Sequence, residues 1–246
     1  MRVGYPVINL EIEEQFTFNR MVGRSRKLLL ETASHNLDML WKTLRFNLER
    51  GLLLFRIRSD FVPYAAHPQR SFDWEAELGP ALAEIGAFVQ ASDMRLTVHP
   101  DLFFGLCSTN EREFEQTLAE LDYQTRLFDA MGLGRPAKIQ MHAGEARGDP
   151  EGSLERFVER YQTLEDRLKA HLVLENDNVF CNLQRCLDVH RQTGIPIVFD
   201  VLHHEVDNRG EDVTSAMASA LGTWRPEDGP PLVDYSSQRP DKLPGR

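Results

Sequence analysis

The 246-residue chain has few cysteines, no long apolar run and no excess of basic residues. The three cysteines, Cys107, Cys181 and Cys186, are an odd number without CxxC spacing, which predicts neither a disulfide framework nor a zinc ribbon. No segment approaches the ~18 uninterrupted apolar residues of a membrane span, and a strand pattern rather than a signal peptide follows Met1. We therefore expect a cytoplasmic protein with reduced thiols and no membrane partner.

The net charge of −10 weakens the case for a nucleic-acid partner, because phosphate binding usually leaves a basic patch. Local charge qualifies this total. Arg20, Arg24, Arg26 and Lys27 cluster near the first long helical pattern, and Arg58 follows the second strand pattern. Divalent cations held in a site would add positive charge that the formal count omits. The acidic composition therefore leaves DNA open as a partner.

Short β-rich apolar segments alternate with helical patterns along the chain. This alternation is typical of α/β proteins with a parallel sheet, and the number of units predicts a (β/α)8 TIM barrel, with residues 1–246 forming a single domain. The tail from Gln238 to Arg246 is rich in proline and charge and cannot be a strand. We therefore expect an incomplete barrel without its eighth strand, truncated at the C-terminal end. The helical patterns cover residues 19–51, 73–92, 111–131, 153–168, 182–192 and 213–221, and the strand patterns cover 3–9, 52–57, 95–99, 138–142, 171–175, 195–199 and 231–237.

Histidine, glutamate and aspartate stand where several strand patterns stop. Catalytic groups of a parallel barrel lie at the C-terminal strand ends, so we expect these side chains to face a common centre. A lone histidine is more often a hydrogen-bonded core or loop residue, but the set favours metal ligation. Of His203 and His204 only one is expected to face inward, and the Asp-x-x-His spacing favours His203. The candidates are His67 on the loop after the second strand, His99, His142, Glu175, Asp200 and His203.

This set of side chains predicts the chemistry of the site. Imidazole and carboxylate ligands without thiolate suit zinc or manganese. Glu175 or Asp200 has two oxygens and can bridge two ions ~3.5–4 Å apart, an arrangement used to hydrolyse phosphodiesters. Glu175, Asp200 and His142 are therefore the candidate catalytic residues. The alternative role for Glu175 is that of an ion-pair partner only.

Motifs from both ends of the chain match a known family in their order. They are Gly4-Tyr5 with Asn9, Phe55-Arg56-x-x-Ser59-Asp60 leading to His67, Leu96-Thr97-Val98-His99-Pro100, Met141-His142-x-Gly144 with Gly148-Asp149, Leu174-Glu175-Asn176-Asp177, Phe199-Asp200-x-x-His203-His204, and Thr223-Trp224-Arg225-Pro226 with Tyr235-Ser236-Ser237-Gln238. Together they resemble the UV damage endonuclease family over essentially the whole chain. The resemblance implies a barrel related to endonuclease IV and the sugar isomerases. It also implies an enzyme that cuts damaged double-stranded DNA on the 5′ side of UV photoproducts and abasic sites, with up to about three metal ions, commonly Mn²⁺.

Carried over by position, the resemblance implies a metal-binding set and a DNA-binding set. The metal ligands would be His67, His99, His142, Glu175, Asp200 and His203, with Asp234 added from the seventh strand; Zn²⁺ and Mg²⁺ are alternatives to Mn²⁺. The DNA-binding residues would be Tyr5, Asn9, Leu102 and Phe103, to which the charge pattern adds Arg58.

The chain also departs from the family pattern. Leu102 and Phe103 replace a Gln-Tyr pair that probes the duplex at the lesion, so an apolar wedge would remain without its hydrogen bonds. Leu232 and Asp234 replace a lysine and a histidine on the seventh strand. Two alternatives therefore stay open: a sugar-isomerase-like metal enzyme on the same barrel, and a damage-binding homologue with impaired cleavage. In each case we expect a monomer.

Overall fold

Strands alternate with helices throughout the computed structural model, which describes residues 1–17, 25–67, 72–100, 105–144 and 148–237. The chain divides into two units, which we describe separately: unit 1 is Met1–His99 with Leu118–Ile139, and unit 2 is Pro100–Thr117 with Gln140–Arg246. The chain passes from one unit to the other after β3 (Arg95–Val98), within α3 (Glu111–Ala130) and within β4 (Lys138–Met141).

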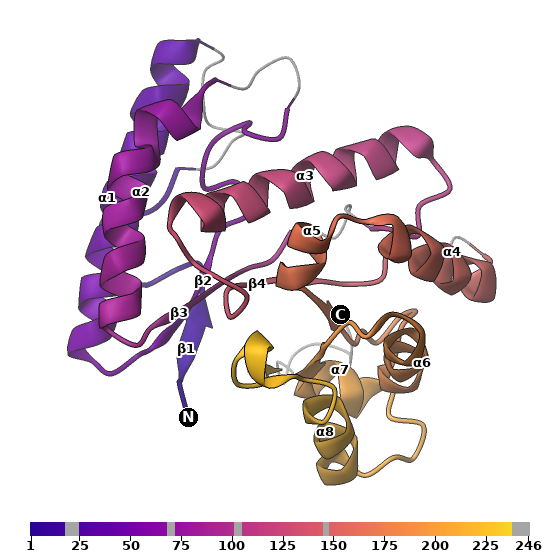
Figure 1. Cartoon of the computed structure of the whole chain (residues 1–246). Coiled ribbons are helices and arrows are strands. Elements are labelled where there is room, and N and C mark those ends of the chain that lie inside the picture. The colour runs from indigo at the N-terminus through magenta and orange to yellow at the C-terminus, as the bar shows by residue number, and fades with distance from the viewer. Residues whose placement is uncertain (18–24, 68–71, 101–104, 145–147, 238–246) are drawn as a thin grey trace. The chain divides into compact units, whose positions relative to one another are not determined.

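Unit 1 contains four parallel strand segments in chain order. β1 (Gly4–Pro6) pairs with β2 (Leu54–Ile57), β2 pairs with β3, and β3 pairs with the first part of β4. Between them run α1 (Arg26–Glu49) and α2 (Trp74–Ala91), which lie side by side (Figure 1) and bring the rings of Trp41 and Phe88 to 5.3 Å between centroids. The predicted first strand is shortened because Val7 adopts a φ of 58°, which ends the extended backbone.

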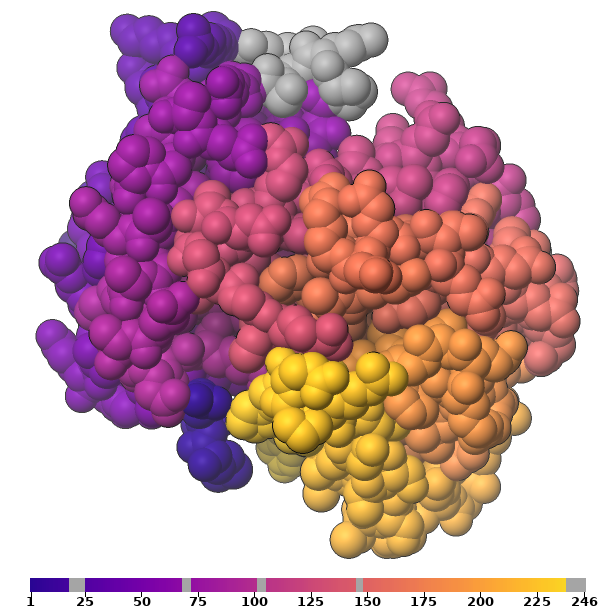
Figure 2. All heavy atoms as spheres, viewed as in Figure 1, coloured from indigo at the N-terminus to yellow at the C-terminus, as the bar shows by residue number. Residues whose placement is uncertain are grey.

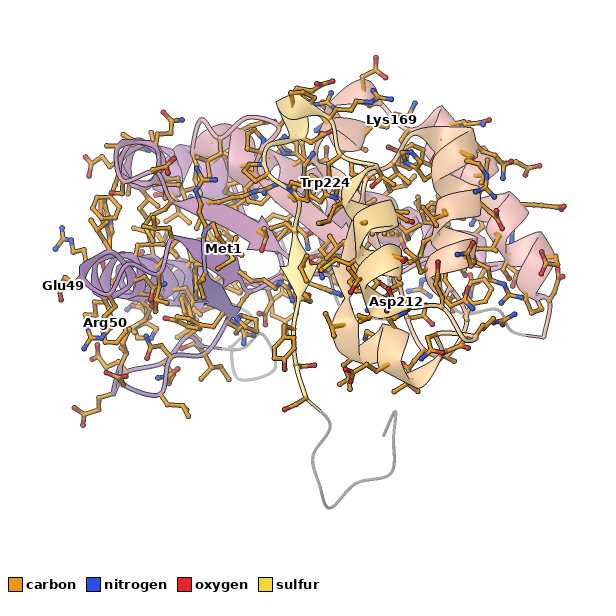
Figure 3. All side chains as sticks on the ribbon, turned by 90° about the horizontal axis from the view of Figure 1, so that it is seen from below. Met1, Glu49, Arg50, Lys169, Asp212 and Trp224 are labelled. Carbon is orange, nitrogen blue, oxygen red and sulfur yellow. The ribbon has the colours of Figure 1, made fainter. Side chains whose placement is uncertain are left out.

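Local sequence explains why α1 forms and where it ends. The Ser25 side chain caps its start by accepting a hydrogen bond from the backbone N–H of Leu28. At its other end Gly51 adopts a φ of 68°, the left-handed conformation in which glycine is favoured. Glu49 and Arg50 project from this end (Figure 3), and the Arg50 guanidinium lies 3.6 Å from the centre of the Phe46 ring. The apolar face buries Leu29, Ala33, Leu37, Leu40 and Leu44, which recur at helical spacing.

Unit 2 contains a second run of parallel strands. β5 (Leu172–Glu175) pairs with β6 (Ile197–Asp200), and β6 pairs with β7 (Val233–Asp234). Every residue of β5 and β6 is buried, which suits their nearly continuous apolar sequences. α6 and α8 contact each other and form part of one continuous surface, orange to yellow in Figure 2. The described helices that lie wholly within unit 2 are α4 (Pro150–Thr163), α5 (Asp166–His171), α6 (Leu183–Thr193), α7 (Val201–Val206), α8 (Val213–Leu221) and the 3-10 turn η2 (Pro226–Asp228).

The predicted helix over residues 153–168 was wrong in one respect, because the structure divides it. Leu164 and Glu165 have extended backbones with ψ of 150° and 146°, so α4 ends before them and α5 begins after them. As a result His171 is the last residue of α5, where we expected the first residue of a strand.

The described residues contain seven strands, as the sequence predicts, and no eighth strand is found among them. Within these same residues, no helix has the length and apolar character needed to cross a membrane. The assignment of residues 1–246 to a single barrel domain stays a prediction.

Candidate metal centre

Glu175 and Asp200 end two neighbouring buried strands of unit 2. Glu175 is 3% exposed and Asp200 7% exposed. Asp200 is also in register with Asp234 of β7. Because the strands are parallel, their C-terminal ends meet at one edge, and the fold gathers acidic side chains there.

The spacing between Asp200 and His203 has a local structural cause. Asp200 is the N-cap of α7, and its Oδ1 accepts a hydrogen bond from the backbone N–H of His203 at 2.8 Å. An N-cap side chain reaches the N–H two or three residues ahead, so the cap holds residue 203 beside residue 200. One ligand atom each from Glu175, Asp200 and His203 lie within 4.8 Å of one another. The predicted convergence of these three residues is confirmed.

His142 joins this group from the residue after β4. Its Nε2 lies 3.5 Å from Glu175 Oε2, and its ring centre lies 5.8 Å from that of His203. Both imidazoles are half-buried. The candidate metal centre of unit 2 therefore comprises Glu175, Asp200, His142 and His203.

Gln140 is a member of the site that the sequence analysis missed. Its Nε2 donates to Glu175 Oε2 at 2.8 Å and to Asp234 Oδ2 at 2.6 Å. Asp234 is thus linked to Glu175 through an amide, although it lies outside the close group of three ligand atoms found among the described residues. The available signal was the period of a strand: Gln140 stands two residues before His142, and alternate residues of a strand share one face.

Asn176 belongs to the motif around Glu175, but its role at the site was not predicted from the sequence. Its side chain donates from Nδ2 to the backbone oxygen of Asp200 at 3.1 Å and accepts at Oδ1 from the backbone N–H of Asp200 at 2.9 Å. The side chain is 1% exposed. This paired amide contact fixes the backbone from which the Asp200 carboxylate projects.

The carboxylates affect one another electrostatically. Burial raises the pKa of Asp200, and the charges of Glu175 and Asp234 raise it further, against the lowering effects of the His203 N–H and the His203 ring. Three acidic side chains therefore share a partly dry region in which a cation would be stabilised. Imidazole nitrogen and carboxylate oxygen are the donor set that Zn²⁺ and Mn²⁺ accept, so the residues fit a divalent transition metal.

The structure separates His203 from its neighbour His204. The ring of His204 is buried against Phe199 with centroids 5.1 Å apart, and its Nε2 lies 3.3 Å from the backbone oxygen of Glu211. His204 therefore packs in the core of unit 2, and the choice of His203 as the inward residue is confirmed.

Two further predicted ligands belong to unit 1. His99 directly follows β3 and is half-buried. His67 lies on the loop after β2, where its ring packs edge-on against Tyr64 at 6.2 Å between centroids. Ligation by His67 and His99 stays a prediction.

The predicted DNA-binding residues of unit 1 have partners within that unit. Asn9 Nδ2 donates to the Tyr5 hydroxyl at 2.6 Å, and that hydroxyl donates to Asn47 Oδ1 at 2.7 Å. Arg58 forms an ion pair with Asp60. Leu102 and Phe103 lie outside the described residues. Contacts of these side chains with DNA stay predictions.

Comparison with known proteins decides the family. The model of the family described as UV-endonuclease UvdE matches residues 15–243. The chain belongs to the UV-endonuclease family. It is similar to SacUVDE, whose crystal structure shares 34% identity and a TM-score of 0.92 over 100% of this chain and 83% of that one. This likeness confirms the predicted fold class, an incomplete (β/α)8 barrel.

Two curated relatives carry the name UV DNA damage endonuclease. The one from Bacillus anthracis (strain A0248) is 28% identical over 227 residues, which are 92% of this chain and 72% of the relative. The one from Clostridium perfringens (strain 13 / Type A) is 29% identical over 242 residues, which are 97% of this chain and 58% of the relative. A D-psicose 3-epimerase from Clostridium cellulolyticum H10 is 16% identical with a TM-score of 0.56, over 76% of this chain and 64% of that one, and shows a shared fold alone.

Proposed function

We propose that this member of the UV-endonuclease family is a metal-dependent DNA repair enzyme. It hydrolyses the phosphodiester on the 5′ side of UV photoproducts and related lesions in duplex DNA. The observation that carries the proposal is the group formed by Glu175, Asp200 and His203, whose ligand atoms lie within 4.8 Å of one another. Family membership supports the endonuclease activity, and the donor chemistry supports the dependence on metal.

Glu175, Asp200, His203 and His142 would hold the divalent ions, with Mn²⁺ as the first choice and Zn²⁺ or Mg²⁺ as alternatives. When bound, such ions stabilise charge on a phosphoryl oxygen and lower the pKa of bound water, most strongly in the case of Zn²⁺. His67, His99 and Asp234 complete the proposed ligand set, for up to about three ions in two-metal or larger clusters.

The surrounding side chains prepare the carboxylates for this task. The Gln140 amide orients Glu175 through the hydrogen bond to Oε2, and Asn176 fixes the backbone of Asp200. Asp200 uses Oδ1 to cap α7, which leaves Oδ2 for an ion. Orientation of this kind is supplied before substrate arrives, so little reorganisation is needed during the reaction.

Damaged double-stranded DNA is the proposed partner, and the protein acts as a monomer in the cytoplasm. Tyr5, Asn9 and Arg58, with Leu102 and Phe103, are the proposed DNA contacts. The formal charge of −10 predicts weak binding to intact duplex, and bound cations offset part of that charge.

A nicking assay tests the proposal. The substrate is a duplex that contains one defined photoproduct, and the enzyme is first stripped of metal and then supplied with Mn²⁺. We expect a single nick on the 5′ side only when metal is present. Equal nicking by the metal-free protein would refute metal dependence. Binding to the lesion without any nick would favour the damage-binding alternative instead.

A further inference from the structure

His203 has a hydrogen bond that determines which of its two ring nitrogens is available. Its Nδ1 lies 2.8 Å from Oδ1 of Asn178. Asn178 is placed with its amide oxygen toward the ring, and an amide oxygen only accepts hydrogen bonds, so in this arrangement Nδ1 carries the proton of the neutral ring. Nε2 then keeps its lone pair, and a lone pair is what a metal ligand requires.

The loop that carries Asn178 is held by hydrogen bonds of its neighbouring residues. The carboxylate of Asp177 accepts from the backbone N–H groups of Val179 at 2.7 Å, Phe180 at 2.6 Å and Cys181 at 3.1 Å. At the end of the loop the Asn182 side chain caps α6. The half-buried side chain of Asn178 is therefore presented on a backbone that other groups fix.

His203 is constrained from two directions as a result. Its backbone N–H is bound to Asp200 at the end of β6, and its ring is bound to Asn178 on the loop after β5. The segment 175–178 thus supplies Glu175 to the site directly, Asn176 to the backbone of Asp200, and Asn178 to the ring of His203.

We propose that Asn178 is a positioning residue that selects Nε2 of His203 as the metal-binding atom. The proposal rests on the proposed function for the identity of the ligand as a metal. The hydrogen bond fixes both the tautomer and the ring plane, which outer partners of metal-ligating histidines commonly do.

The first test uses metal-free protein, so it does not depend on the proposed function. Nitrogen-15 NMR of the His203 ring, recorded well above the ordinary imidazole pKa of about 6.5, reports which nitrogen is protonated. We expect the Nδ1–H tautomer in the wild type and in Asn178→Asp, which keeps an acceptor oxygen. Asn178→Leu should show a large gain in the Nε2–H tautomer, which is favoured in free imidazole side chains. An Nε2–H tautomer in the wild type, or an unchanged tautomer in Asn178→Leu, overturns the proposal.

The second test measures Mn²⁺ affinity by titration. Loss of an outer partner typically costs 10–100-fold in metal affinity, so Asn178→Leu should weaken binding by about that factor. Asn178→Asp should restore most of it. The matched control is Asn208→Leu, because Asn208 Oδ1 also accepts one hydrogen bond, from the backbone N–H of Gly210 at 2.8 Å, but the Asn208 side chain has no hydrogen bond to a proposed ligand among the described residues.

Together the two tests distinguish failure of the positioning role of Asn178 from failure of the proposed metal binding. Unchanged affinity in Asn178→Leu, with wild-type affinity in the Asn208 control, would show that Asn178 does not position a ligand. If the wild type itself binds no Mn²⁺, the proposed metal function fails, and the tautomer measurement still decides whether Asn178 controls His203.

Discussion

Each unit has a pair of polar side chains within or just beyond its parallel strands, and the two pairs differ in their hydrogen bonding. The pair in unit 1 is Tyr5 and Asn9, and the pair in unit 2 is Glu175 and Asp200. In unit 1 donors and acceptors alternate, because the Asn9 amide donates to the Tyr5 hydroxyl and that hydroxyl donates to Asn47. In unit 2 carboxylates that can only accept hydrogen bonds are brought together, and the pKa of Asp200 rises through burial and its acidic neighbours. A chain of matched partners stabilises the fold by itself, whereas neighbouring carboxylates repel one another even when each accepts a hydrogen bond, and a bound cation would relieve that repulsion.

Neutralising the Glu175 carboxylate in unit 2 should have the largest effect on activity. Glu175→Gln removes a charge and a coordinating oxygen while keeping the shape of the side chain. We expect nicking in Mn²⁺ to fall by more than about 100-fold, beyond the range for loss of an outer partner. The melting temperature of the metal-free protein should stay the same or rise, because repulsion with Asp200 is relieved.

The control for this change lies in unit 1. Tyr5→Phe should leave Mn²⁺ stoichiometry unchanged. Full metal content in Glu175→Gln, or a strongly lowered melting temperature of its metal-free form, would show that Glu175 is an internal hydrogen-bonding residue like Tyr5.

The next largest effect is expected on stability, at a glycine two residues after His142 whose backbone has a positive φ. Gly144 has a φ of 112°, and an added Cβ would lie 2.6 Å from Cys107 Sγ. We expect Gly144→Ala to lower the free energy of unfolding by about 2–4 kcal/mol, from backbone strain together with steric overlap. Urea denaturation measures the change.

A second glycine separates these two causes. Gly210 has a φ of 84° with nothing within 4 Å of the added Cβ, so Gly210→Ala should cost only the strain, about 1 kcal/mol. Equal costs at both positions would contradict the contact of Gly144 with Cys107.

Removing the Tyr5 hydroxyl, which links Asn9 to Asn47 in unit 1, should have a smaller effect on stability. Tyr5→Phe leaves Asn9 and Asn47 without their shared hydroxyl, and we expect a loss of about 1–2 kcal/mol in the free energy of unfolding. Tyr235→Phe is the control, because Tyr235 is 81% exposed. A loss of discrimination for damaged DNA without any loss of stability would instead support the DNA-binding role of Tyr5.

The sequence predicts elements and ligands best where a local rule determines them. The helix over residues 213–221 was predicted with its observed bounds, and Asp212 caps it. The Asp-x-x-His spacing favours His203 over His204, and the structure shows that this spacing is the distance from an N-cap to the N–H that it binds. The break between α4 and α5 was missed because Leu164 and Glu165 are neither glycine nor proline, and either residue type would have indicated a stop.

The contacts of the supporting residues could not be predicted in the same way, although the strand period places Gln140 on the same face as His142. Gln140 and Asn176 bind through amides, which have no metal-binding signature. Their roles depend on how β4, β5 and β6 bring distant residues together. Gln140 contacts Asp234 across 94 positions of the chain, a pairing that only the tertiary structure determines.

The smallest expected effect is on the reactivity of a buried thiol, Cys186, whose pKa is influenced by Asp177 and Glu175. Burial raises the pKa of Cys186 well above its ordinary value, with Cys181, Asp177 and Glu175 adding to the shift. A raised pKa means that the folded protein keeps the proton, so this contribution to stability is complete below the unfolded thiol pKa of about 8.5 and declines as pH rises above it.

Native protein should therefore react with iodoacetamide at Cys186 only as fast as it opens, even at alkaline pH, since the thiolate is the reactive form. Mass spectrometry of native and urea-unfolded samples measures this, and labelling should become rapid only after unfolding. Rapid native labelling of Cys186 near neutral pH would place the thiol in an exposed, anion-stabilising environment. That result would show that the surroundings of Glu175 stabilise negative charge even without a cation, unlike the repulsive environment inferred for the carboxylates of unit 2.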